Sequence, residues 1–101
     1  MDKRTKELIE IVISIIKKFL RRDTNFRLYL FGSRATGNNR KFSDIDLAVE
    51  SSAMNNEWFK KIKQNILEIR TLYKIDLVNL NTVSSEFKNI VLSEANTLYE
   101  Q

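Results

Sequence analysis

Two aspartates, Asp44 and Asp46, are the residues of this chain best suited to binding a metal ion. From Asp44 to Val49 polar and apolar positions alternate, which is typical of a strand with both carboxylates on one face. Aspartate is depleted in strands, so two of them on one face need a reason. Carboxylate oxygens bind Mg²⁺ at about 2.0–2.1 Å, and the ions of a two-metal site lie about 3.5–4 Å apart. The pair can therefore share one divalent cation or hold two.

A second candidate for chemistry lies just upstream, where the apolar run 26–31 stops at Gly32 and Ser33. A turn that follows a strand and leads into a helix can offer backbone N–H groups and a hydroxyl to phosphate oxygens. We expect Ser33 to cap a short helical turn at 34–36, which Gly37 ends. A phosphate-binding turn close to a pair of metal-binding carboxylates indicates chemistry on a nucleoside triphosphate.

Each of these features also has a plainer interpretation. A Gly-Ser pair after a strand is more often only a turn, and an Asp-x-Asp on a strand is more often a solvated face. Calcium binding of the EF-hand kind needs a central glycine and a final glutamate in its loop, and the segment after Asp44 does not supply them. For Arg34 two interpretations stay open: the side chain contacts the phosphates, or it forms a salt bridge elsewhere.

Together the two features have a characteristic spacing. Gly32 and Ser33, then ten residues, then Asp44 and Asp46 resemble the signature of the DNA polymerase β-like nucleotidyltransferase superfamily. The fuller strings LFGSRATG and SDIDLAV resemble its smallest branch, the minimal nucleotidyltransferase (MNT) domains of prokaryotes. The resemblance extends over about 26–80 of the chain.

This resemblance implies roles for particular residues. The Gly-Ser turn would bind the triphosphate, with Arg34 as a further candidate for phosphate contact, and the paired aspartates would hold two Mg²⁺ ions. A third carboxylate on a neighbouring strand completes such sites and helps to activate the attacking hydroxyl. Asp76, the single acid of the strand-like segment 74–80, is the candidate. Thr36 stands where many relatives carry a second arginine, a departure that touches no metal ligand.

Composition narrows the class of protein. The chain has 101 residues, 43% of them hydrophobic, so we expect one domain, 1–101, with a small core. Cysteine and histidine are absent, which excludes disulfides, histidine-ligated zinc and a Ser-His-Asp triad. No segment is long and apolar enough to cross a membrane, the charged start does not resemble a signal peptide, and we expect a cytoplasmic protein. The net charge of +4 suits a polyanionic substrate, but no nucleic-acid-binding motif is visible and direct nucleic-acid binding is not expected.

Hydrophobic periodicity predicts the elements that position these residues. The expected order is helix, strand, short turn, strand, helix, strand and helix, over about 5–22, 26–31, 34–36, 44–49, 56–72, 74–80 and 85–98, with Asn55 or Asn56 as the cap of the second long helix. We predict a small mixed β-sheet with helices packed on it, a two-layer α/β sandwich like the nucleotidyltransferase (polymerase β palm-like) core. A loop of about a dozen residues permits antiparallel pairing of the first two strands, which would bring Ser33 near Asp44.

The resemblance implies an enzyme that moves AMP from ATP to a hydroxyl and releases pyrophosphate, with Mg²⁺ as cofactor. Catalysis would consist of positioning and charge neutralisation, with Asp44, Asp46 and Asp76 as the catalytic carboxylates. Little of the chain is left over to close over an acceptor, so we expect another chain to provide it. MNT domains are commonly paired with small all-helical HEPN proteins. In such toxin–antitoxin pairs the MNT antitoxin can adenylylate a tyrosine of the HEPN ribonuclease.

Two other functions stay open. The chain can self-associate and use a small-molecule acceptor such as an aminoglycoside, or it can be a non-catalytic antitoxin that occludes a helical partner. Substituting Asp44 and Asp46 by asparagine separates these, because an enzymatic antitoxin loses its function and an occluding one keeps it. No purine pocket is recognisable in the sequence, so the nucleotide preference is not predicted beyond the family's ATP.

Overall fold

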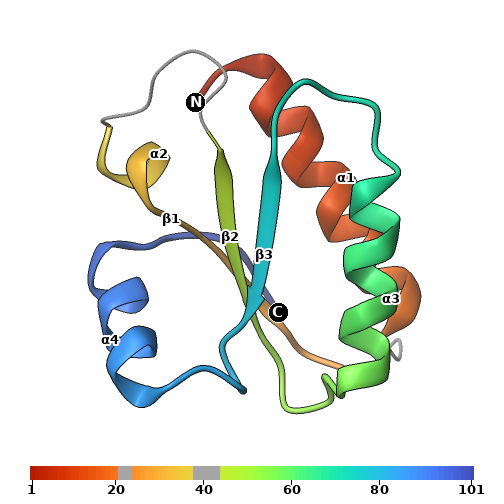
Figure 1. Cartoon of the computed structure of the whole chain (residues 1–101), viewed down its shortest axis with the longest axis vertical. Coiled ribbons are helices and arrows are strands. Elements are labelled where there is room, and N and C mark those ends of the chain that lie inside the picture. The colour runs from red at the N-terminus through yellow and green to blue at the C-terminus, as the bar shows by residue number, and fades with distance from the viewer. Residues whose placement is uncertain (21–23, 38–43) are drawn as a thin grey trace.

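The computed structural model describes residues 1–20, 24–37 and 44–101 (Figure 1). Its elements in chain order are α1 (Lys3–Phe19), β1 (Arg27–Phe31), α2 (Ser33–Thr36), β2 (Ile45–Glu50), α3 (Asn56–Leu67), β3 (Ile75–Asn79), α4 (Ser85–Glu94) and β4 (Asn96–Glu100). The first seven elements occur in the predicted order, and β4 follows them. Part of the predicted loop between the first two strands, 38–43, and the predicted last residues of the first helix, 21–22, lie outside the described residues.

The strands form one sheet in the order β3-β2-β1-β4. β1 pairs antiparallel with β2, as predicted, and with β4 on its other side, while β2 and β3 run parallel. A parallel pair needs a crossover connection, which α3 provides. The register places Phe31 beside Asp46, and Asp46 beside Asp76. The predicted mixed sheet is confirmed, and the end of β1 meets the beginnings of β2 and β3.

Helices cover both faces of the sheet, so the expectation of only two layers is wrong. On one face α1 and α3 form the larger core cluster, which includes Leu8, Val12, Ile16, Leu28, Leu30, Ile45, Leu47, Val49, Ile62 and Ile66. On the other face α4 closes a smaller cluster of Tyr29, Ala48, Leu80 and Val91 (Figure 1). Neighbouring residues of β2 enter different clusters because a strand alternates its side chains. Each fully buried Leu or Ile contributes about 1.5–3 kcal/mol relative to an exposed one.

The C-terminal segment corrects the predicted final helix. That helix ends at Glu94, Ala95 is extended, and Asn96–Glu100 pairs with β1 as a fourth strand. Leu98 fits the helical spacing of the preceding residues, but Thr97, Leu98 and Tyr99 also suit a half-buried strand. Pairing with the open edge of β1, which is a long-range interaction, selects the strand over the helix. The ring of Tyr99 stacks 4.6 Å from that of Phe26 and helps to hold the strand in place.

The helix ends are set by local signals. Asn55 caps α3 as predicted, since its side chain accepts a hydrogen bond from the Trp58 backbone at 2.7 Å. The same helix ends at Leu67 and not near 72, because Ile69 and Tyr73 reach the core from an irregular segment that only mimics helical spacing. None of the helices in the described ranges has the length and apolar character that crossing a membrane requires.

Candidate active site

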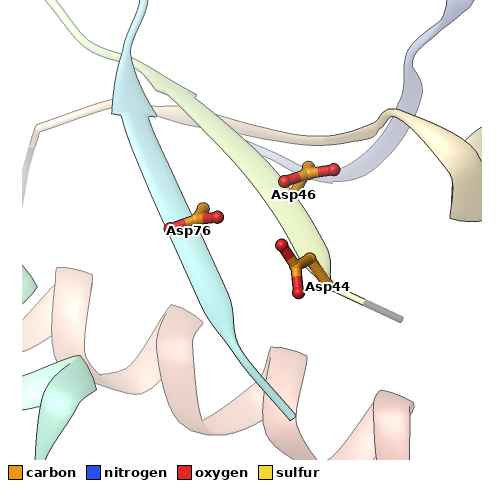
Figure 2. A group of neighbouring side chains, drawn as sticks. All are labelled: Asp44, Asp46 and Asp76. Carbon is orange, nitrogen blue, oxygen red and sulfur yellow. The ribbon is translucent and has the colours of Figure 1, made fainter. Parts of the chain in front are cut away.

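Three carboxylates converge where β2 and β3 begin. Asp44 directly precedes β2, Asp46 is its second residue, and Asp76 is the second residue of β3. One oxygen from each carboxylate lies within 4.8 Å of those of the other two. Figure 2 shows the three side chains gathered over the same part of the sheet. The structure therefore brings together the three aspartates that the sequence singled out.

Strand geometry explains this convergence. The parallel register makes Asp46 and Asp76 direct neighbours, and Asp44 shares their face because side chains alternate along a strand. The intervening Ile45 is fully buried on the opposite face, so a shift of one residue would place a carboxylate in the core. The hydrophobic pattern thus fixes the position of the acids.

The carboxylates are poorly compensated by the described residues around them. Partial burial raises the pKa of Asp46, and the nearby charges of Asp76 and Asp44 raise it further, while Lys74 acts in the opposite direction. Lys74 Nζ lies 3.8 Å from Asp76 Oδ2. Oxygen donors at this spacing suit a hard divalent cation, whose charge would offset their mutual repulsion.

Gly32 holds the predicted phosphate-binding turn directly against this group. Its φ of +75° is one that L side chains rarely adopt, and a Cβ at this position would overlap Asp46 Oδ2 and lie 3.3 Å from Asp46 Cγ. Glycine is therefore required both for conformation and for close approach. The contact follows from the register, because Gly32 comes directly after Phe31, the neighbour of Asp46.

The short helix α2 differs from the prediction at its start. Gly32, and not Ser33, is the N-cap, and no side chain caps the helix. Ser33 is its first residue, while Gly37 ends it in the left-handed conformation, as predicted. The N–H of Gly32 donates to Glu94 Oε1 at 3.4 Å. No sequence signal indicated Glu94, because α4 reaches this turn only through the tertiary fold.

Arg34 lies on the inner side of the turn. Its side chain is only 6% exposed, and Nη1 is 3.9 Å from Asp2 Oδ2. Nη1 also donates to Thr5 Oγ1 at 3.1 Å, and the guanidinium lies 4.9 Å from the Tyr73 ring centre. Of the two interpretations of Arg34, phosphate contact and a salt bridge elsewhere, the structure contains the salt bridge. These contacts tie α2 to the start of α1 and to the segment before β3, and contact with phosphate stays a prediction.

Sequence comparison agrees with this geometry. Residues 14–101 match the family described as polymerase beta, nucleotidyltransferase. This chain belongs to that family. The resemblance inferred from the Gly-Ser turn and the aspartates is therefore confirmed. A nucleotidyltransferase of this family uses a nucleotide substrate, and the aspartate cluster is suited to a metal ion.

Individual relatives of this nucleotidyltransferase carry more specific names. Probable protein adenylyltransferase MntA of Haemophilus influenzae is 28% identical over 92 residues, covering 90% of this chain and 77% of the relative. The crystal structure of a toxin–antitoxin complex with AMP-PNP matches with a TM-score of 0.69 at 24% identity, covering 95% of this chain and 73% of the other. A complex of the tri-AMPylated Shewanella oneidensis HEPN toxin with its MNT antitoxin matches with a TM-score of 0.65 at 21% identity, covering 93% and 71% of the two chains. At such identities the two structures establish the fold.

Proposed function

We propose that this nucleotidyltransferase is an MntA-like protein adenylyltransferase that moves AMP from ATP to a hydroxyl of a HEPN-type partner protein. The observation that carries the proposal is the contact between Gly32 and Asp46, which joins a phosphate-binding turn to three converging carboxylates. The adenylyltransferase named among its relatives supports the reaction, and the AMPylated HEPN complex supports the class of acceptor.

In this reaction Asp44, Asp46 and Asp76 would hold Mg²⁺, and the ion would supply positive charge to neutralise what develops on the phosphates. The Ser33 hydroxyl and the backbone N–H groups at Gly32 and Ser33 bind the β- and γ-phosphates. Glu94 must release the Gly32 N–H before a phosphate oxygen can use it.

Bond making and breaking are centred on the α-phosphorus. The acceptor oxygen forms a bond to the α-phosphorus. The bond between the α-phosphorus and the oxygen that bridges to the β-phosphate breaks. Asp76, whose side chain is 45% exposed, takes the proton of the acceptor hydroxyl as pyrophosphate leaves. Arg34 acts as a positioning residue, since its guanidinium anchors the turn from the side facing α1.

The acceptor comes from outside this chain. We propose that 1–101 forms a single catalytic domain, that the modified hydroxyl is a tyrosine of the partner, and that the protein acts in the cytoplasm, where ATP and Mg²⁺ are available. The role is that of an antitoxin that inactivates its partner by modification.

Transfer of label from α-³²P-ATP tests this proposal. The chain is incubated with Mg²⁺ and the protein product of the gene beside its own, and mass spectrometry locates the labelled residue. We expect label on a tyrosine of the partner, no label with Asp44→Asn, and full labelling with Glu57→Gln, a matched control on the exposed surface of α3. A stable complex without label would overturn the enzymatic role and favour occlusion. Label on an aminoglycoside alone would favour the small-molecule acceptor.

A further inference from the structure

One side of α4 faces the active-site end of the sheet. Phe87 and Glu94 lie about two helical turns apart and therefore share a side of the helix. Both contact the end of β1: the Phe87 ring is 6.3 Å from the Phe31 ring in an edge-to-face arrangement, and Glu94 accepts from the Gly32 N–H. Ile90 lies between them at helical spacing. We call Phe87, Ile90 and Glu94 the site-facing side of α4.

The other side of α4 points to the opposite end of the sheet. Lys88 Nζ lies 2.7 Å from Glu50 Oε2, and Glu50 is the register partner of Arg27, the first residue of β1. Leu92 follows Lys88 at helical spacing, so it belongs to this far side. Between the two sides Val91 is buried against the sheet. The helix thus presents two distinct surfaces whose orientations its contacts define.

The site-facing side exposes large apolar groups. Ile90 is 60% exposed and Phe87 is 37% exposed. The path from this surface to the carboxylates is short, because Phe87 touches Phe31 and Phe31 lies beside Asp46 in the sheet. An apolar surface that adjoins a candidate catalytic centre marks a binding region more strongly than scattered exposed leucines do.

We propose that the site-facing side of α4 is the docking surface for the protein acceptor, and that it receives an apolar patch next to the hydroxyl that is modified. This inference rests on the proposed function in one respect, namely that the acceptor is a protein. The charge of Glu94 further calls for a basic residue at the edge of the partner's patch.

The area that a protein complex needs supports this occupant. A stable complex buries about 800 Å² on each partner, and the whole accessible surface of this chain is 6623 Å². Such a footprint centred on the three carboxylates must extend well beyond them. The reverse face of the sheet is covered by α1 and α3, so the footprint spreads along the face that α4 occupies. A small-molecule acceptor would have no need of this surface.

Two variants of the same helix test the inference. Ile90→Lys places a charge on the site-facing side, and Leu92→Lys places the same charge on the far side, where the residue is 40% exposed. The full chain is used, with thermal melting to establish that both variants fold. The protein product of the neighbouring gene and N-acetyl-tyrosinamide serve as large and small acceptors, and titration calorimetry measures the partner complex and AMP-PNP binding separately.

For Ile90→Lys we expect at least a tenfold rise in both the KM for the protein acceptor and the Kd of the complex, as for a central interface residue. For the same variant, labelling of N-acetyl-tyrosinamide and the Kd for AMP-PNP should stay within twofold of the wild-type values. Leu92→Lys should change neither these two quantities nor the KM for the protein acceptor and the Kd of the complex. Equal effects of the two variants, or no effect of Ile90→Lys, would overturn the docking surface. Weaker AMP-PNP binding by Ile90→Lys would assign the surface to the nucleotide base, and loss of a homodimer in sedimentation would assign it to a second copy.

The calorimetric measurement separates this inference from the proposed function. If the wild-type chain labels no protein but binds the partner, and Ile90→Lys weakens that binding, the catalytic role fails and the docking surface stands. If the wild-type chain labels the partner and Ile90→Lys does so equally well, the catalytic role stands and the docking surface fails.

Discussion

Polar side chains are compensated by partners to different degrees at the two ends of the sheet. Where β2 and β3 begin, three carboxylates crowd together with Lys74 as the cation that lowers the pKa of Asp46. Where the same strands end, Asn79 and Ser51 are buried but take part in a hydrogen-bonded network. Asn81 joins them, donating from its backbone to Asn79 Oδ1 at 3.0 Å and from its side chain to the Ser51 carbonyl.

The difference between the two ends extends to charged side chains. At the ends of β2 and β3 Glu50 is also neutralised, with Lys88 at 2.7 Å and Arg27 at 3.9 Å. Of the buried side-chain nitrogens and oxygens in the described ranges, Asn79 Nδ2 alone lacks a partner. Apart from Asn79 Nδ2, folding thus satisfies the buried polar groups described at this end, whereas the other end keeps charges that a cation would stabilise. Uncompensated charge therefore distinguishes the candidate site from the opposite end of the sheet, where β2 and β3 end.

The largest effect is expected from Asp46→Asn. Loss of a metal ligand should reduce AMP transfer by at least about 10³-fold, or about 4 kcal/mol in the activation barrier. Because partial burial and the neighbouring aspartates both oppose ionisation of Asp46, removing its charge should leave the melting temperature unchanged or raise it in the absence of metal. Mg²⁺ should stabilise the wild type and not the variant, as metal binding to the folded state requires. Calorimetry with and without Mg²⁺ checks this, and a variant that melts lower and still responds to Mg²⁺ contradicts it.

A smaller loss is expected from Gly32→Ala, with Gly37→Ala as its matched control. Both glycines have positive φ, +75° and +81°, so both substitutions incur a strain of about 1–2 kcal/mol. Only at Gly32 does the new Cβ meet another group, Asp46, whereas nothing lies within 4 Å at Gly37. We expect transfer to fall about 10²-fold with Gly32→Ala, or about 3 kcal/mol, and severalfold at most with Gly37→Ala. Equal losses in steady-state assays would show that backbone strain, and not the contact with Asp46, governs the turn.

Much of the candidate site could be predicted because its signals are local. Alternation around Ile45 places Asp44 and Asp46 on one face, and a single acid in the following strand-like segment identifies Asp76. The Gly-Ser turn ends an apolar run, so its place at the end of β1 was also visible. The structure adds the register, which sets these local pieces side by side.

The remaining features depend on contacts between distant parts of the chain. Arg34 reaches Asp2 and Thr5, and no pattern along the sequence distinguishes that ion pair from a phosphate contact. The strand at Asn96–Glu100 was mistaken for helix because only the free edge of β1 selects its conformation. The exposure of Ile90 could not be predicted from the sequence either, since its spacing fits a core-facing position of a helix.

Arg34→Met tests whether the contacts of Arg34, which hold the turn in place, contribute to activity at the active-site end of the sheet. Loss of a nearly buried, charge-assisted hydrogen bond should lower the free energy of unfolding by about 2 kcal/mol, and the loosened turn should raise the KM for ATP about tenfold. Arg4→Met is the control, because Arg4 forms an exposed pair with Glu7 and should cost less than about 0.5 kcal/mol. Urea denaturation and ATP titration measure the two effects. An unchanged stability with a collapsed kcat would instead place the guanidinium on the phosphates.

The smallest effect on activity is expected at the other end of the sheet. Ser51 Oγ donates to the Asn25 carbonyl at 2.9 Å and accepts from the Ala53 backbone at 3.3 Å, so Ser51→Ala leaves both groups without this partner. We expect a loss of about 1–2 kcal/mol in the free energy of unfolding and no more than a twofold change in AMP transfer. Ser14→Ala removes an exposed hydrogen bond within α1 and should change stability little. If Ser51→Ala reduced transfer as strongly as Arg34→Met, the two ends of the sheet would be coupled, and neutral polar networks would no longer mark a region without catalytic function.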